Sequence, residues 1–151
     1  MGASGLTGGC QCGAVRFRVS GEPEEANICH CRMCQKASGQ PFMAFARVPA
    51  ALFAMTKGAL AVFHSSDVVE RGFCSACGTP LTYRNTDGDR ISFAICALDD
   101  PATVAPTQQL AAEQAVPWLK AGLAAENVSL DAWFKDKPLP GFASRQHPDH
   151  D

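Results

Sequence analysis

Short runs in which apolar and polar residues alternate recur along the chain. In residues 14–19, AVRFRV, the apolar Val15, Phe17 and Val19 alternate with small or charged residues. Side chains two residues apart in a strand point to the same side, so this pattern predicts a half-buried strand. The same reasoning predicts further strands at residues 42–48, 59–65, 68–73, 81–85 and 90–96. The Asp-Gly pair in TDGD, residues 86–89, predicts a hairpin between the last two.

Helices are expected only as short segments. Residues 32–38, RMCQKAS, predict a short helix, whereas residues 107–115 are ambiguous between helix and strand. Many short strands with few helices are typical of a mainly β domain built from small sheets. A chain of 151 residues is long enough for one such domain. We therefore predict one domain over residues 1–135, followed by an extended tail over residues 136–151 that is rich in proline and polar residues.

The charge balance narrows the range of partners. The net charge is −2 at pH 7, and no run of lysine and arginine stands out. Strong attraction to nucleic acid or to an anionic membrane is therefore not expected. The first ten residues, MGASGLTGGC, lack the basic and apolar segments of a secretory signal, and no apolar run of about 20 residues predicts a membrane span. We expect a cytoplasmic protein, in which the eight cysteines are metal ligands or reactive thiols rather than disulfides.

Four of the cysteines have the spacing of a closed metal site. Cys74 and Cys77 are separated by two residues, and Gly78 after them lets the chain turn without a Cβ clash. Cys10 and Cys12 are two positions apart, so in an extended segment their side chains face the same way and can chelate together. The two pairs predict a tetrahedral site of four thiolates, which is the ligand set of structural zinc.

The segment ICHCRMC, residues 28–34, contains three more cysteines. Cys29 and Cys31 would share one face of a strand, and Cys34 would follow at turn spacing, so the three can hold one metal ion. Three protein ligands and a vacant fourth position are the arrangement of catalytic zinc. The sequence therefore predicts a second zinc site that is open.

The alternative is that the second site is also structural and is closed by His30 or Cys96. In an extended segment His30 faces away from the cysteines on either side of it, so we expect it to be packed or hydrogen-bonded instead. Cys96 ends an apolar strand and is predicted to be a small buried residue.

The chain resembles the glutathione-dependent formaldehyde-activating enzyme family, which also includes centromere protein V. The matching blocks are GGCQCGAVRF (8–17), CHCRMCQKASG (29–39), RGFCSACGTPLTYRN (71–85) and ALDDP (97–101), with PW at 117–118 as a later landmark. The resemblance spans residues 6–120 and implies several small coiled antiparallel sheets organised around two zinc ions per chain. It implies a structural zinc held by Cys10, Cys12, Cys74 and Cys77, and a catalytic zinc held by Cys29, Cys31 and Cys34.

The family's named reaction is the reversible addition of the glutathione thiol to formaldehyde, which gives S-hydroxymethylglutathione. The resemblance therefore implies a zinc-dependent carbon–sulfur lyase whose partner is a small-molecule thiol. A metal-coordinated thiol loses its proton, so zinc could present glutathione as a thiolate at neutral pH. Basic residues available for the two glutathione carboxylates are Arg32, Lys36, Arg47, Arg71 and Arg84.

The alternative function is a non-catalytic, zinc-stabilised binding module in which both zinc sites are structural, as centromere protein V suggests for part of the family. A module attached to chromatin or filaments would be expected to carry a basic extension, and this chain has only a short tail of mixed charge. The sequence therefore favours the enzyme.

Overall fold

The computed structural model describes residues 5–135 and 144–150, so most of the predicted tail, residues 136–143 and 151, lies outside the described residues. Within the described ranges, ten strands form two sheets. The smaller sheet has the strand order β1-β2-β5 and consists of β1 (Leu6–Gly9), β2 (Arg16–Val19) and β5 (Phe53–Lys57). Both of its strand pairs are antiparallel.

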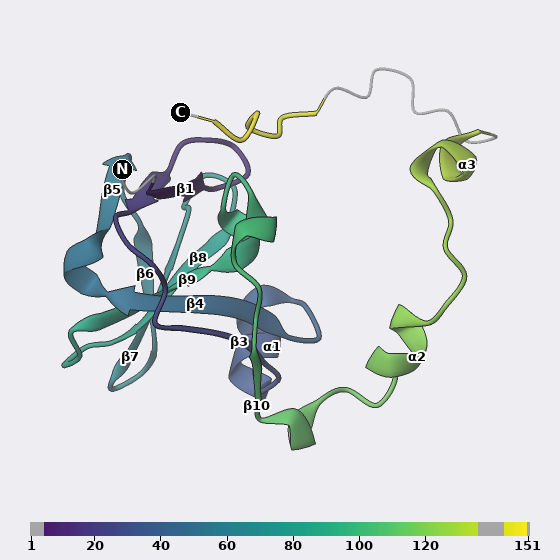
Figure 1. Cartoon of the computed structure of the whole chain (residues 1–151), viewed down its shortest axis with the longest axis horizontal. Coiled ribbons are helices and arrows are strands. Elements are labelled where there is room, and N and C mark those ends of the chain that lie inside the picture. The colour runs from purple at the N-terminus through teal and green to yellow at the C-terminus, as the bar shows by residue number, and fades with distance from the viewer. Residues whose placement is uncertain (1–4, 136–143, 151) are drawn as a thin grey trace.

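The larger sheet has seven strands in the order β10-β3-β4-β9-β8-β7-β6 (Figure 1). Its strands are β3 (Glu25–Cys29), β4 (Met43–Pro49), β6 (Ala61–Ser66), β7 (Val69–Phe73), β8 (Pro80–Asn85), β9 (Arg90–Ala94) and β10 (Gln108–Leu110). Every neighbouring pair is antiparallel except β10 and β3, which run parallel. The prediction of a mainly β fold is confirmed.

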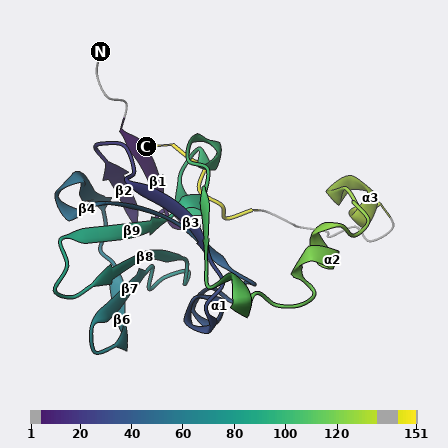
Figure 2. The same ribbon diagram turned by 60° about the horizontal axis from the view of Figure 1, so that its bottom comes forward.

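Helical segments are short. α1 (Arg32–Ser38) follows β3 and has the bounds predicted from the sequence. α2 (Leu119–Leu123) and α3 (Leu130–Phe134) belong to an extension that leads away from the sheets in both views (Figures 1 and 2). Short 3-10 helices occupy Ala50–Leu52, Ile95–Ala97, Pro101–Thr103 and Ala112–Gln114. None of the helices in the described ranges is long and apolar enough to cross a membrane.

The six strands predicted from alternation are all present, with ends that shift by no more than two residues. The ambiguous segment 107–115 contains both kinds of structure, because β10 is followed by a 3-10 helix. β1 and β5 were not predicted as strands, and β3 was expected only at its C-terminal end. Residues 144–150 contain no helix or strand and return to the turn after β1, where the His147 N–H donates to the Gln11 carbonyl at 2.8 Å.

The core lies between the two sheets and centres on Phe17 and Phe93, which are both fully buried. Phe17 of β2 stacks on Phe53 of β5 with ring centroids 5.1 Å apart, and it meets Phe93 of β9 at 6.0 Å. Gly8 lets β1 approach the segment after β9, since a Cβ there would overlap the carbonyl oxygen of Ala97. Aromatic packing and one close backbone approach therefore join the sheets.

A buried ion pair ties the segment after β9 to the smaller sheet. The Arg16 guanidinium on β2 donates two hydrogen bonds to the Asp99 carboxylate, at 2.7 and 2.5 Å. The Thr7 hydroxyl on β1 donates a third, at 2.6 Å. Hydrogen bonds from Arg16 hold the pKa of Asp99 below its usual value. Because Asp99 belongs to the ALDDP block, this block has a structural role in the fold.

We expect Asp99→Asn to lower the free energy of unfolding by about 3 kcal/mol, because it removes the carboxylate charge that faces the buried Arg16 guanidinium. The difference from wild type should be full at neutral pH. The difference should shrink below about pH 4, the pKa of an aspartate in the unfolded chain. The pKa of Asp99 is lower in the folded protein, so its carboxylate stabilises the fold fully above that pH. This stabilisation is lost as the pH falls through the folded-state pKa. Urea unfolding at several pH values measures both effects.

Asp89→Asn is the control for this prediction. Asp89 pairs with Arg90 at the surface, and its side chain is 88% exposed. An exposed pair of this kind contributes little, so the substitution should change the free energy of unfolding by less than about 1 kcal/mol. Equal losses in the two variants would show that burial of the Arg16–Asp99 pair is not what stabilises the fold.

Candidate metal centres

The cysteines predicted to form a closed site lie together. Their sulfur atoms are all within 4.8 Å of one another, and this four-cysteine cluster consists of Cys10, Cys12, Cys74 and Cys77. The Sγ atoms of Cys10 and Cys12 are 3.6 Å apart, and those of Cys12 and Cys74 are 3.9 Å apart. Four sulfurs that each lie about 2.3 Å from a central zinc would be separated by about 3.8 Å, so the spacing fits a tetrahedral metal ion.

Two tight turns place these sulfurs. After β7, the N–H of Gly78 donates to the carbonyl of Cys74 at 2.8 Å, and Gly78 has a φ of 78°. After β1, the N–H of Gly13 donates to the carbonyl of Cys10 at 3.1 Å, with a φ of 74° at Gly13. The chain is therefore turned between Cys10 and Cys12, and the extended geometry predicted for this pair is wrong although the grouping is right.

The thiols of the four-cysteine cluster differ in pKa. The backbone N–H of Ala14 acts to lower the pKa of the Cys12 thiol, but hydrogen bonds with the thiols of Cys77 and Cys10 and burial raise it to about 11. Burial acts to raise the pKa of the Cys77 thiol, but the hydroxyl and the backbone N–H of Thr79 outweigh it and lower the pKa to about 6. The N–H of Val15 donates to the Sγ of Cys10 at 3.2 Å. Since the thiolate is the form of cysteine that binds metals, a cation between the four sulfurs would favour the ionised form of all of them.

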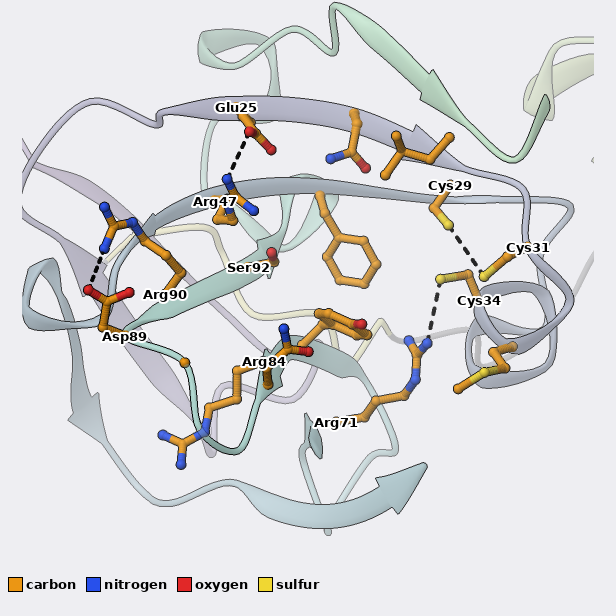
Figure 3. Close-up of a pocket in the computed structure, with 17 residues that line it drawn as sticks. Glu25, Cys29, Cys31, Cys34, Arg47, Arg71, Arg84, Asp89, Arg90 and Ser92 are labelled. Atoms are coloured by element: carbon orange, nitrogen blue, oxygen red, sulfur yellow. Dashed lines mark hydrogen bonds and ion pairs between the residues drawn. The ribbon is translucent and has the colours of Figure 1, made fainter. Parts of the chain in front are cut away.

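The other three predicted ligands form a second group, the three-cysteine cluster, at one end of a cavity (Figure 3). Cys29 is the last residue of β3, Cys31 directly precedes α1, and Cys34 lies in the first turn of α1. The Sγ atoms of Cys29 and Cys31 are 3.4 Å apart, and all three sulfurs lie within 4.8 Å of one another. The change from strand to helix, rather than a shared strand face, brings them together.

The pKa values of these three thiols indicate that the cluster needs a positive charge beside it to ionise fully. Burial raises the pKa of the Cys34 thiol to about 12, and it also raises the pKa of Cys29. Burial acts in the same direction on Cys31, but the backbone N–H of Cys34 and the neighbouring thiols lower its pKa overall. The three thiols therefore do not all ionise at neutral pH by themselves. A divalent cation would supply the missing positive charge, so the donor set fits a metal ion.

A cavity of about 420 Å³ extends from the three sulfurs over β3, β4, β9 and β8. The rings of Phe45 and Tyr83, with centroids 6.0 Å apart, are part of its lining. Figure 3 shows Arg47 and Arg90 at the end opposite the cysteines. The Nη2 of Arg47 donates to Glu25 at 2.8 Å, whereas its Nε is buried and has no hydrogen-bond partner among the described residues. The cavity therefore has three sulfurs at one end and arginines paired with carboxylates at the other, with two aromatic rings also in its lining.

Two of the other predicted basic residues also line the cavity. Arg84 donates to Glu70 at 2.9 Å, and Arg71 is buried with its Nη2 3.5 Å from the Sγ of Cys34. Arg32 and Lys36 are not among the lining residues. The contact between Arg71 and sulfur was not predicted.

His30 behaves as the sequence predicts. It is buried, its Nε2 lies 2.9 Å from the Oε1 of Gln109, and its ring meets that of Phe42 with centroids 5.7 Å apart. Its side chain is therefore hydrogen-bonded and packed, and it does not belong to the three-cysteine cluster.

Cys96 lies elsewhere, and its predicted burial is wrong. It is exposed in the 3-10 helix Ile95–Ala97 and lines a different cavity, of about 850 Å³. The strand β9 ends at Ala94, so the alternation on which the prediction depended stops before Cys96. Closure of the second cluster by Cys96 is also contradicted, because the sulfurs grouped there come from other residues.

Loss of one ligand should affect the two clusters differently. We expect Cys77→Ala to unfold the protein or abolish soluble expression, since the four-cysteine cluster connects the turns after β1 and β7. Metal binding at structural sites contributes on the order of 10 kcal/mol to the folding of small domains. Cys34→Ala should lose the metal of the three-cysteine cluster and stay folded. Elemental analysis and thermal unfolding measure the outcome, with two metal ions per chain expected in the wild type because there are two clusters.

Cys96→Ala should keep both metals and the stability of the wild type, because Cys96 lies outside both clusters. A fully loaded wild type with one metal ion would contradict the division into two centres. A greater loss of stability in Cys34→Ala than in Cys77→Ala would reverse their roles.

Known proteins with similar sequences share these segments. Residues 5–114 match the family described as glutathione-dependent formaldehyde-activating enzyme. An uncharacterized lyase of Schizosaccharomyces pombe is 32% identical over 81 residues, which cover 54% of this chain and 58% of that protein. A protein of Halomonas elongata named "Putative glutathione-dependent formaldehyde-activating enzyme" is 54% identical over 35 residues, which cover 22% of each. The matched region is thus less than two thirds of either relative.

A solved structure shares the fold. The crystal structure of a Rhodobacter sphaeroides protein has a TM-score of 0.55 and 18% identity, and the match covers 68% of this chain and 98% of that one. The family match includes every residue of both cysteine clusters. This chain therefore belongs to the glutathione-dependent formaldehyde-activating enzyme family.

Proposed function

We propose that this protein is a zinc-dependent carbon–sulfur lyase-like enzyme that acts on a thiol–aldehyde adduct such as S-hydroxymethylglutathione. The observation that supports the proposal most directly is the cavity of about 420 Å³ beside the sulfurs of Cys29, Cys31 and Cys34. Small-molecule sites commonly have volumes of about 300–1,000 Å³. Family membership and the lyase name of the S. pombe relative support the reaction class.

Zinc is the metal that we propose for both clusters, two ions per chain. Ligand sets made only of sulfur favour zinc over harder cations, and the sulfur spacings fit zinc–sulfur distances. We assign a structural zinc to the four-cysteine cluster, which completes a tetrahedral set. We assign the catalytic zinc to the three-cysteine cluster, which leaves one position beside the cavity. Zinc bound there would stabilise the sulfur of a thiol substrate as a thiolate.

The other residues of the cavity would position the substrate. The reaction joins the thiol sulfur to the formaldehyde carbon, and the thiol proton ends on the former carbonyl oxygen. Phe45 and Tyr83 would shield the reacting atoms from water. The Nε of Arg47, which is buried without a partner among the described residues, would donate to a glutathione carboxylate. Glutathione is kept reduced in the cytoplasm, and we propose that the protein acts there.

Titration with glutathione tests the proposal. We expect equal binding to wild type and Cys96→Ser, because Cys96 lines the other cavity. Cys34→Ser should bind glutathione at least about tenfold more weakly, since it removes a ligand of the catalytic zinc. Calorimetry measures the binding, and exchange NMR measures how fast formaldehyde and S-hydroxymethylglutathione interconvert.

The outcomes separate three functions. Binding together with faster interconversion supports the lyase. Binding without acceleration indicates a carrier of glutathione or of another thiol. Absence of binding to both wild type and Cys96→Ser would reject glutathione and favour the non-catalytic binding module in which both zinc sites are structural.

Arg47→Met tests the proposed contact between Arg47 and a substrate carboxylate. Because a hydrogen bond to a charged group contributes roughly 1.5–3 kcal/mol, glutathione should bind about tenfold or more weakly to this variant. Binding of 2-mercaptoethanol, a thiol without a carboxylate, should not change. Arg18→Met, on β2 and away from the cavity, is the control for the loss of one positive charge. Equal weakening of the two thiols by Arg47→Met would show that Arg47 does not recognise a carboxylate.

A further inference from the structure

Arg71 is a buried cation that faces sulfur. It lies on β7 and is 8% exposed. Its Nη2 donates to the Sγ of Cys34 at 3.5 Å, and its Nε donates to the hydroxyl of Ser65 at 3.3 Å. The guanidinium carbon lies 5.0 Å from the centroid of the Tyr83 ring. These contacts, which involve only described residues, do not include a carboxylate.

The other arginines of the cavity have different surroundings. Arg47, Arg84 and Arg90 each pair with a glutamate, at 2.8, 2.9 and 2.7 Å, and all three side chains are substantially exposed. A charge at the surface is solvated and needs no partner, whereas a buried charge is costly unless an opposite charge lies close to it. The counter-charge of Arg71 therefore has to come from the sulfurs beside it.

The net charge of the three-cysteine cluster with a metal ion bound indicates a role for Arg71. Three thiolates and one divalent cation would together carry a single net negative charge, which the guanidinium of Arg71 beside Cys34 would neutralise. We propose that Arg71 balances the charge of the three-cysteine centre and thereby selects an anionic fourth ligand, such as a substrate thiolate, over a neutral one. The proposal rests on the metal assigned to this centre under the proposed function, but not on glutathione as the substrate.

The geometry of the side chain suits this role. A guanidinium has five N–H donors in a fixed plane, and the contacts with Cys34 and Ser65 use only some of them. Tyr83 holds the plane by a cation–π contact. Figure 3 shows that the guanidinium ends beside Cys34 at the wall of the cavity. Donors of Arg71 therefore remain for a ligand of the metal that Cys34 would bind.

The position of Arg71 gives its charge the sign that this role needs. Its Nη2 lies 3.5 Å from the Sγ of Cys34 in a buried setting. A positive charge this close favours negative charge on the group that it faces, as a counter-ion does.

Substitution of Co²⁺ for zinc at the three-cysteine centre allows a test that does not depend on activity, because the absorption of Co²⁺ changes with its fourth ligand. The two probes are 2-mercaptoethanol, which binds as an anionic thiolate, and imidazole, which binds as a neutral ligand. In Arg71→Met the affinity for 2-mercaptoethanol should fall about 10- to 100-fold, the range for a lost hydrogen bond to a charged group. The affinity for imidazole should stay the same. Arg71→Lys should recover most of the preference, since it restores the charge but not the planar fork.

Arg84→Met is the matched control. It removes a positive charge from the wall of the same cavity, at a residue that is bonded to Glu70 rather than to sulfur. Its ligand preference should equal that of the wild type. If thermal unfolding shows that Arg71→Met does not fold, Arg71→Gln takes its place. Arg71→Gln should also bind 2-mercaptoethanol more weakly than Arg71→Lys does and bind imidazole equally well.

Equal weakening of both probes, or an unchanged preference in the uncharged variants, would overturn the role of Arg71. A wild type whose three-cysteine centre takes up no Co²⁺ would overturn this proposal together with the metal assignment. Loss of the thiolate preference in a protein that does not bind glutathione would support the role of Arg71 and reject only the proposed substrate.

Discussion

The arrangement of the two sheets depends on the clustering of four sulfurs from distant parts of the chain. Cys12 and Cys74 are 62 positions apart in the sequence, and their Sγ atoms are 3.9 Å apart. One pair of cysteines follows β1 in the smaller sheet, and the other follows β7 in the larger sheet. A metal ion shared by the four would fix these two turns relative to each other. The aromatic core and the Arg16–Asp99 pair cross the same boundary, so packing and charge hold the interface that such a metal ion would also hold.

The sequence predicted the features that depend on neighbouring residues. Strands such as β2 and β9 have one face on the core, so their apolar residues alternate and the pattern is visible. β1 is different, because its sequence LTGG contains a glycine that is required for the close approach to Ala97, and glycine normally argues against a strand. β3 turns Glu25, Asn27 and Cys29 to the cavity and only the small Ala26 packs on the apolar core, so its residues EANIC show no clear alternation. Cysteine spacing predicted which sulfurs meet, but not whether the chain between them is extended or turned.

Contacts between segments that are distant in the sequence, such as the one between Arg71 and Cys34, were not predictable from local patterns. Arg71 occupies a strand position on the same face as Val69, which is buried, and a charged residue at such a position indicates a buried cation. That signal was present in the sequence. The identity of its partner was not, because Cys34 lies 37 residues earlier on α1 and only the fold brings the two together. Cys96 was misjudged because nothing in its own neighbourhood marks the point where β9 ends.

The two clusters also differ in how far apart their members lie along the chain, and this affects the order in which a metal can be acquired. The three-cysteine cluster lies within residues 29–34, whereas the four-cysteine cluster needs residues 10–77. A short segment closes around an ion at a small entropic cost, but a long loop has to wait for the intervening chain to fold. During synthesis from the N-terminus, Cys29, Cys31 and Cys34 are added to the chain before Cys74 and Cys77. Metal uptake at the ribosome would therefore begin at the segment that lines the cavity and end at the cluster that joins the sheets.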